Sequence, residues 1–277
     1  MIIRSVCYGL LALVALETVV AQVPQLPARL VNNPHVRWGH AGGNCELLVQ
    51  RYYIICEDKT HRVPRWVTYR LGRENLRDNV QRESNPFHAD RRLPRGERSE
   101  QSDYEHTGYD MGHMAPAGDF HRGARAMYET FLMSNMAPQR PNLNRVIWRR
   151  LEDQIRRIAR DHGTIWVFTG PLYLNAAGNA AVAPDKFIGR NRVAVPTHYF
   201  KIVLCEHADH NQEMFAFIMP NQQAPFARPA LDYLVSVDSV ERLSGRNAAE
   251  RLDFFAGLPD ARENVLERGR APTWPLP

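Results

Sequence analysis

The chain has 277 residues, of which 44% are hydrophobic and 23% are charged, and its formal net charge is +5 at pH 7. Such a composition supports a sizeable core, which excludes a mainly disordered chain, and the length allows one large domain or two small ones. The basic balance is common among soluble proteins, but it favours anionic partners, with nucleic acid first among them.

Residues 1–21 are predicted to be a signal peptide. A positive charge lies within Met1–Arg4, Val6–Val20 is mostly apolar, and small residues up to Ala21 offer a cleavage site. The apolar run is short and contains Glu17, which argues against a membrane-spanning helix. The mature protein is therefore expected to be secreted or periplasmic, with no stable membrane association once the signal is removed.

Three cysteines follow the predicted signal peptide: Cys45, Cys56 and Cys205. Export would place them where a disulfide can persist, and an odd number leaves at least one free or paired with another chain. A Cys45–Cys56 bond would close a short local loop, and Cys205 could pair with either. The sequence leaves this choice open.

The simplest organisation is one mixed α+β domain, because neither an internal repeat nor a low-complexity linker interrupts the chain. Residues 22–44 are expected to lead onto the domain. Residues 45–260 are expected to form it, and residues 261–277 to follow as a Pro-rich C-terminal tail.

The first half of the domain is predicted to start with a hairpin of strands Leu47–Ile55 and Trp66–Leu71, with turn residues at Glu57–Pro64. Arg73–Tyr104 is polar and broken by prolines, and a loop of this length is more often functional or mobile than not. Met111–Pro116 is expected to be extended. Further elements are predicted as a short helix at Gly123–Met133 and as strands at Ile165–Thr169, Thr197–Leu204 and Met214–Met219.

Asn142–His162 is the clearest helix, since apolar residues recur every three or four positions and Gly163 ends it. At about 100° per residue, Asn144 falls inside the apolar stripe and Glu152 lies at its edge. A buried amide needs a partner, and a carboxamide oxygen suits Mg²⁺, whose waters Glu152 could hold. The alternative is that Asn144 caps the helix.

His113 lies between Gly112, where the backbone can pack closely, and Pro116, which stiffens the chain. A neutral imidazole can take a proton from water, and a hard cation can stabilise charge on a phosphate, so these groups suffice for phosphodiester cleavage. The ordinary alternative is a structural or surface histidine. Asp110 is expected to orient the local backbone.

Two other patterns are open to functional interpretation. The arginines of the helix are expected on its solvated face, although a band that follows phosphates is an alternative; they are Arg145, Arg149, Arg156, Arg157 and Arg160. The histidines His106, His113 and His121 fit none of the common zinc-binding spacings.

A set of motifs resembles the DNA/RNA non-specific endonucleases of the ββα-metal (His-Me finger) group. The motifs are Asp-x-Gly-His at 110–113, Ser-Asn-x-x-Pro-Gln at 134–139, Asn-Leu-Asn at 142–144 and Trp-x-x-Leu-Glu at 148–152. The likeness extends to Pro64–Tyr69, Thr169–Pro171 and Phe217–Asn221 and covers most of Cys45–Leu258. It implies an α+β, ββα-metal fold with a central antiparallel sheet and flanking helices, and DNA and RNA as substrates.

The resemblance also implies residue roles. His113 matches the general base and Asn144 the Mg²⁺ ligand, with Mn²⁺ or another divalent cation as alternatives. Asn135 and Glu152 match residues that support the site. Gln139 and Asn142 lie in the same motif and, with Asp110, are expected on the substrate side.

Met111 departs from the family pattern, which usually has at this position an arginine thought to contact phosphate. A second family arginine best matches Arg82, which is therefore included among the expected catalytic residues. Arg122 or Arg91 could supply the missing charge beside Met111. Two rival functions follow: a nucleic-acid-binding homologue with impaired catalysis, and a metal phosphodiesterase for a non-polymeric substrate. Monomer and homodimer are both left open.

Overall fold

A computed structural model describes six stretches of the chain: residues 27–77, 86–121, 123–161, 163–180, 183–245 and 250–268. The expected signal peptide and the candidate residues Arg82 and Arg122 lie outside these residues. Within them, no helix combines the length and the apolar character needed to cross a bilayer.

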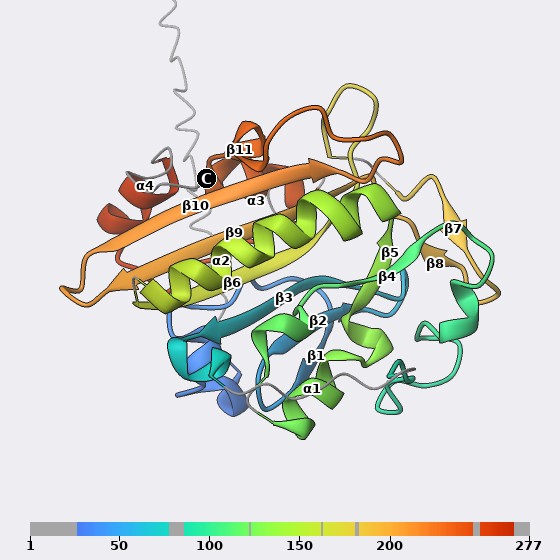
Figure 1. The fold of residues 1–277 in the computed structure, drawn as a ribbon, viewed down its shortest axis with the longest axis horizontal. Coiled ribbons are helices and arrows are strands. Elements are labelled where there is room, and N and C mark those ends of the chain that lie inside the picture. The colour runs from blue at the N-terminus through green and yellow to red at the C-terminus, as the bar shows by residue number, and fades with distance from the viewer. Residues whose placement is uncertain are drawn as a thin grey trace, which may run out of the picture.

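The core of the fold is a seven-stranded sheet in which every neighbouring pair is antiparallel (Figure 1). This confirms the central antiparallel sheet. The strands are, in spatial order, β1 (Glu46–Val49), β2 (Ile54–Asp58), β3 (Val63–Leu71), β6 (Gly163–Leu172), β9 (His198–His207), β10 (Gln212–Pro220) and β11 (Leu234–Val235).

One predicted strand was wrong. Leu47–Ile55 is two strands, β1 and β2, that reverse direction between Val49 and Ile54. The strand-forming residues Tyr52 and Tyr53 lie in the reversal and conceal it in the sequence. Pairing of β2 with β3 gives the hairpin that was predicted.

Each face of the sheet packs against its own hydrophobic core, because successive side chains of a strand point to opposite sides. In β9, Tyr199 and Val203 belong to one core, whereas Phe200, Ile202 and Leu204 belong to the other. Helix α2 (Arg149–Asp161) covers the first face (Figure 1). The second face is covered by the N-terminal segment together with α3 (Val237–Ser244) and α4 (Asp260–Arg268).

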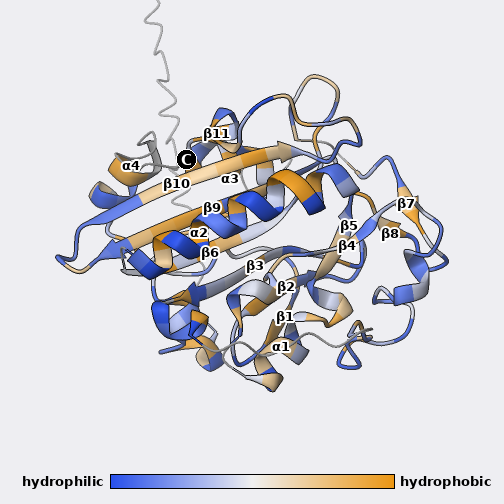
Figure 2. Cartoon of the chain, viewed as in Figure 1, coloured by the Kyte–Doolittle hydropathy of each residue, from blue (hydrophilic) through white to orange (hydrophobic). Residues whose placement is uncertain are grey.

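The predicted helix 142–162 begins as a π-helix over Leu143–Trp148 and continues as α2. Leu151, Ile155 and Ile158 are buried as the apolar spacing predicts. Most of the outward-facing length of α2 is hydrophilic (Figure 2). The π-helical start was not predicted, and it changes the direction of every side chain that precedes α2.

Two short strands complete the unit that positions the site. β4 (Asp110–His113) pairs antiparallel with β5 (Met136–Gln139), and α1 (Ala124–Thr130) lies between them in sequence. β4 agrees with the predicted extended segment. β5 was not predicted, because it contains Pro138 and a proline argues against a strand. Together β4, β5 and α2 form a ββα unit; β7 (Phe187–Ile188) and β8 (Val193–Ala194) form a separate small ribbon.

The cysteines adopt one of the arrangements left open by the sequence. Cys45 and Cys56 form a disulfide with a Cα–Cα distance of 5.3 Å, and Cys205 is a buried free cysteine. Parts of the expected leader and tail also belong to the folded body. Leu30 and Val36 are buried in the second core, and α4 forms part of the segment expected to trail.

Candidate active site

A groove of about 750 Å³ runs between β4 and the start of the long helix. It brings together most of the predicted site residues: His113 from the end of β4, Asn144 from the π-helical segment and Glu152 from α2. Asp110 and Met111 of β4 also line it, as does Arg156 of α2. The ββα unit therefore assembles residues that are separated by some 40 positions in the sequence.

The imidazole of His113 is held by aromatic rings. Phe131 packs edge-on against it with the centroids 4.9 Å apart, and the Phe87 ring lies at 5.8 Å. The preceding residue must be glycine, because a Cβ at Gly112 would collide with the side chain of Gln139 on β5. Tight strand pairing and ring packing thus leave His113 half-buried at the groove with little freedom to rotate.

Asn135 fixes the chain that follows His113. Its side chain accepts a hydrogen bond from the Ala115 amide at 2.9 Å and donates to the carbonyls of Ala115 at 2.9 Å and Thr130 at 2.8 Å. Its own carbonyl accepts from the Met114 amide at 2.9 Å. Because Asn135 is fully buried, it supports the site from behind and does not contact the groove.

Replacing Asn135 with alanine should lower the free energy of unfolding by about 3 kcal/mol, because buried backbone groups of Ala115 and Thr130 lose their partners. Urea denaturation followed by circular dichroism measures this. Asn179 is exposed, so Asn179→Ala is a suitable control with little expected change. An equal effect of both substitutions would contradict the supporting role.

Asp110 orients the side chain of Asn144. The Asn144 amide nitrogen donates to Asp110 Oδ2 at 3.0 Å. Arg145 grips the same carboxylate through Nε at 2.8 Å and Nη2 at 2.5 Å. An ionised carboxylate only accepts hydrogen bonds, so the amide nitrogen of Asn144 must face it and the carboxamide oxygen is turned away. Among the described residues, that oxygen accepts no side-chain hydrogen bond, so a cation could bind it.

The donor set fits a hydrated Mg²⁺ better than a zinc ion. Among the described residues, no group of three or more His, Cys, Asp or Glu side chains could hold a metal. Mg²⁺ binds oxygen ligands and keeps several waters, so one carboxamide oxygen with a nearby carboxylate is a sufficient protein contribution. Asn144 would be the direct ligand, and Glu152, which lies in the same groove, would hold its waters.

Asn144 corrects the expectation drawn from a regular helix. It is half-buried at the groove wall and does not lie within the core stripe, whose nearest buried members are Leu143 and Ile147. Nor does Asn144 cap the helix, since its backbone N–H already donates to the Arg140 carbonyl at 2.9 Å, as in a residue inside a helix. The π-helical geometry explains the difference, because the projection assumed α-helical rotation.

Glu152 sits in an unusual electrostatic environment. Burial raises the pKa of the Glu152 carboxyl to about 7, against the attraction of Lys201 and Arg156, which lowers it. Arg156 is itself paired with Asp119 at 2.6 Å and with Asp153 at 2.6 Å. Glu152 therefore belongs to a compact group of charged side chains at this side of the groove, together with Lys201, Arg156, Asp119 and Asp153.

Arg156 lines the groove, although its position on the helix predicted a solvated side chain. This was wrong: its side chain is only 12% exposed and is held by Asp119 from the turn after β4. Arg156 follows Glu152 by four residues, so both side chains lie on one side of the helix. This spacing was the sequence signal that could have placed Arg156 at the groove. Arg149 also lines the groove.

The remaining candidates lie around this centre. Gln139 is fully buried beneath Gly112, a place with no access to a bound polymer. The side chain of Asn142 donates to the Gln223 carbonyl and ties the start of the helix to the segment after β10. Met111 packs partly into the core while lining the groove.

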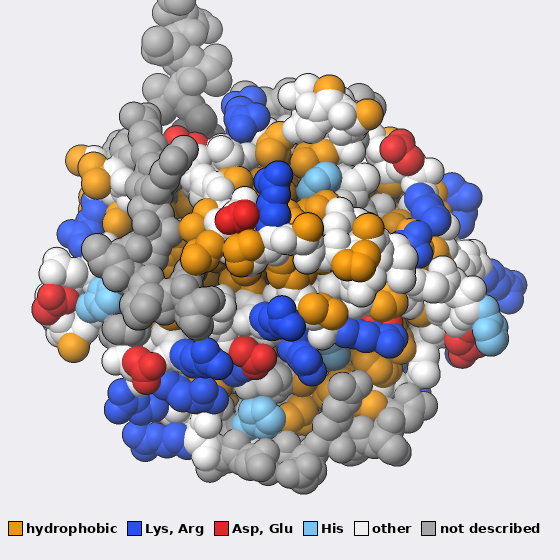
Figure 3. Space-filling model, turned by 45° about the horizontal axis from the view of Figure 1, so that its top comes forward, with side chains coloured by type: hydrophobic (Ala, Val, Ile, Leu, Met, Phe, Trp, Pro, Cys, Tyr) orange, Lys and Arg blue, Asp and Glu red, His pale blue; other side chains and the backbone are white. Residues whose placement is uncertain are grey.

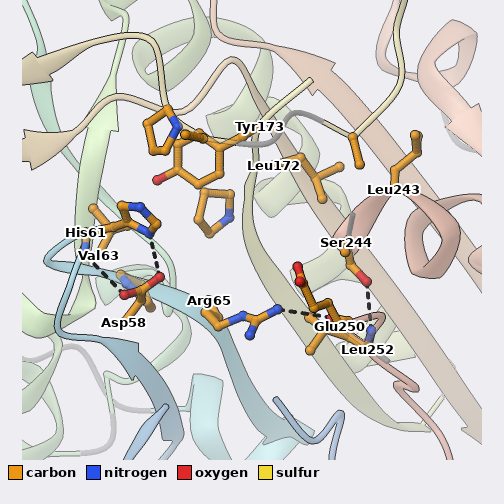
Figure 4. Close-up of a pocket in the computed structure, with 16 residues that line it drawn as sticks. Asp58, His61, Val63, Arg65, Leu172, Tyr173, Leu243, Ser244, Glu250 and Leu252 are labelled. Carbon is orange, nitrogen blue, oxygen red and sulfur yellow. Dashed lines mark hydrogen bonds and ion pairs between the residues drawn. The ribbon is translucent and has the colours of Figure 1, made fainter. Parts of the chain in front are cut away.

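A second, smaller cavity of about 290 Å³ lies between the start of β3, the end of β6 and the chain after α3 (Figure 4). Its Asp58–His61 pair, 2.6 Å apart, belongs to a turn, because Asp58 also accepts from the amides of Thr60 and His61. Arg65 is occupied by the Glu250 carbonyl at 3.2 Å. None of the predicted site residues lines this smaller cavity.

The surface carries a band of basic side chains. Figure 3 shows Lys and Arg gathered across the lower half of one face, with a few acidic side chains among them. On the helix, Arg145 has 68% of its side chain exposed, and Arg149, Arg150, Arg157 and Arg160 are exposed as well. A positively charged surface beside a groove suits a polyanionic ligand.

The ββα unit, with a histidine on its strand and an asparagine at the start of its helix, defines a nuclease class, and sequence comparison agrees. Residues 32–261 match the DNA/RNA non-specific endonuclease family. The chain belongs to this family, and its fold is the ββα-metal fold of these nucleases.

Similar proteins occur in animals and fungi. The chain is 37% identical over 205 residues to mitochondrial endonuclease G of Bos taurus, an alignment that covers 73% of this chain and 69% of that protein. It is 34% identical over 222 residues to nuclease C1 of Cunninghamella echinulata var. echinulata, covering 79% and 88%. A crystal structure of an EndoG/EndoGI inhibitor complex superposes with a TM-score of 0.74 at 35% identity, covering 85% of this chain and 94% of that one.

Proposed function

We propose that this protein is a divalent-metal-dependent endonuclease that hydrolyses phosphodiester bonds in DNA and RNA with little sequence preference. One observation carries the proposal. The Asn144 amide nitrogen donates to Asp110, so the carboxamide oxygen points away from Asp110 and could bind a cation in the groove that His113 also lines. The basic surface beside the groove supports a polymeric substrate over a small one.

His113 acts as the general base, taking a proton from the attacking water through its imidazole. Asn144 would hold the cation, which when bound offsets negative charge on the phosphate and the leaving oxygen. Glu152 accepts hydrogen bonds from water on the other side of the groove. Asn135 and the aromatic rings beside His113 keep the base aimed at the scissile phosphate.

Arg145 supplies the positive charge that Met111 does not. Its guanidinium is held by the Asp110 carboxylate at the groove wall, yet the side chain remains 68% exposed. The guanidinium fork suits a phosphate as well as a carboxylate, so a bound strand can share it.

Arg145→Gln should raise KM for DNA several-fold and reduce the slope of log KM against log salt by about one, as expected when one phosphate contact is lost. Arg262→Gln is the control, because Arg262 is exposed on α4, at the other face of the sheet. Met111→Arg in the Arg145→Gln background should recover most of the affinity. If Met111→Arg instead raised wild-type cleavage by several orders of magnitude, the natural protein would be an impaired homologue.

Digestion of plasmid DNA and of a long RNA with Mg²⁺, and with EDTA in place of the metal, tests the function directly. The endonuclease reading requires degradation of both polymers and full inhibition by EDTA. Binding without cleavage would identify a non-catalytic nucleic-acid-binding protein. Hydrolysis confined to small phosphodiesters would identify the other alternative.

The signal-like N-terminus supports export of the mature enzyme. Expression of the full chain in a bacterial host, followed by fractionation and N-terminal sequencing, should recover a periplasmic or secreted protein that begins at Gln22. Retention of the first 21 residues would contradict export.

A further inference from the structure

A lysine lies in the middle of the central sheet. Lys201 of β9 has no exposed surface, and its side chain points to the same face as Tyr199 and Val203, toward α2. Lysine is almost never fully buried unless it is paired, because removing an ammonium group from water costs several kcal/mol. Its strand neighbours in register, Thr169 and Phe217, offer no negative charge.

The ammonium group of Lys201 lies directly beneath the start of α2. It sits 4.7 Å from the centre of the Trp148 ring and, among the described residues, has no hydrogen-bond acceptor. Trp148 precedes Glu152 by four residues, so both side chains project from the same side of the helix. Burial lowers the pKa of Lys201, whereas the charge of Glu152, and to a smaller extent that of Asp119, raises it.

Glu152 is the acidic side chain of this group that has no ion pair within 4.0 Å among the described residues, and its charge is the one that acts most strongly on Lys201. Asp119 is already engaged at both oxygens, by Arg156 at Oδ1 and by the Tyr69 hydroxyl at Oδ2, at 2.6 Å and 2.8 Å. Arg156 also holds Asp153. Arg156 with Asp119 and Asp153 carries a net charge of −1, so it offers no spare positive charge to Glu152, and Lys201 is the cation that is left for that carboxylate.

We propose that Lys201 is a positioning residue of the nuclease site, which supplies from the sheet beneath α2 the positive charge that keeps Glu152 an ionised carboxylate at the groove. This inference rests on the proposed function, since Glu152 is taken to hold water in that site. Without Lys201, burial and the negative charges of Asp119 and Asp153 favour the protonated form of Glu152, and a neutral carboxyl is a weaker acceptor for bound water. Lys201 itself contacts neither substrate nor cation.

Lys201→Met is the direct test, because methionine keeps the shape of the chain and removes only the charge. We expect kcat for plasmid cleavage at pH 7 to fall about 10- to 100-fold, as for other residues that orient a metal site, while KM for DNA changes little. The acid side of the pH–rate profile should move to higher pH, so that activity is partly recovered in alkaline buffer. Lys59→Met is the control, since Lys59 is an exposed lysine in surface ion pairs with Glu46 and Glu97.

A stability measurement separates this role from simple core packing. Lys201→Met should lower the urea midpoint in the wild-type background, because the charge of Glu152 loses the attraction of Lys201, but not in the Glu152→Gln background. An equal loss in both backgrounds, or an active Lys201→Met enzyme with the wild-type pH profile, would overturn the proposal. A wild type that cleaves neither polymer would refute the proposed function itself, whereas an active wild type with an equally active variant would refute only the role of Lys201.

Discussion

Replacing His113 with alanine should reduce cleavage of plasmid DNA and of RNA about 1,000-fold while leaving the fold intact, since a positioned general base contributes roughly 10²- to 10⁴-fold. The imidazole is half-buried between Phe87 and Phe131 and lies at the end of a strand, so its loss removes the proton acceptor without opening the main core. Initial rates in Mg²⁺ and thermal unfolding by circular dichroism measure the two effects.

His210 provides the matched control. Its side chain is 86% exposed in a turn with a left-handed backbone, which asparagine tolerates, so His210→Asn should have wild-type activity. A His113→Ala enzyme with full activity would refute the mechanism. Addition of imidazole should restore part of the activity of His113→Ala if the missing group is a base.

Asn144→Ala should lose cleavage and metal response together. The substitution removes the free carboxamide oxygen and the hydrogen bond to Asp110, so activity at saturating Mg²⁺ should fall at least about 100-fold and half-saturation should require far more metal. Titration of residual activity with Mg²⁺ and Mn²⁺ measures both changes.

Asn211 offers the same chemistry away from the groove. Its side-chain amide donates to the carboxylate of Asp209 at 2.7 Å in an exposed turn, so Asn211→Ala removes an equivalent Asn–Asp hydrogen bond. The Mg²⁺ dependence of Asn211→Ala should match that of the wild type. An unchanged metal response in Asn144→Ala would mean that another residue binds the cation.

Local patterns in the sequence were enough to predict several strands and the long helix, whereas the central antiparallel sheet was predicted from the family resemblance. The apolar spacing of Leu151, Ile155 and Ile158 defines the buried side of α2, and strand composition locates β3, β6, β9 and β10. The motif around His113 and Asn144 indicated which residues meet, and the ββα unit brings them to one groove.

What the sequence could not predict depends on contacts across the fold. Arg156 reads as a solvated charge until Asp119, 37 residues away, is placed beside it. Lys201 reads as an ordinary residue of a strand until α2 is laid over it. The reversal between β1 and β2 and the proline-containing β5 lack the usual local signals, and pairing partners decide both.

Because of the π-helical segment Leu143–Trp148, the side chains at the two ends of the helix are oriented by different contacts. A π turn holds one residue more than the α turn it replaces, so Asn144 is offset by about 100° from where a continuous α-helix would put it relative to Glu152. The C-terminal part of the helix is fixed by the apolar side of α2, which packs in the core. The extra residue rotates the N-terminal part so that Asn144 faces Asp110. Deleting one residue from this segment would therefore keep the anchoring of the helix and lose the alignment of Asn144. The length of this short stretch, rather than its composition, determines where Asn144 lies.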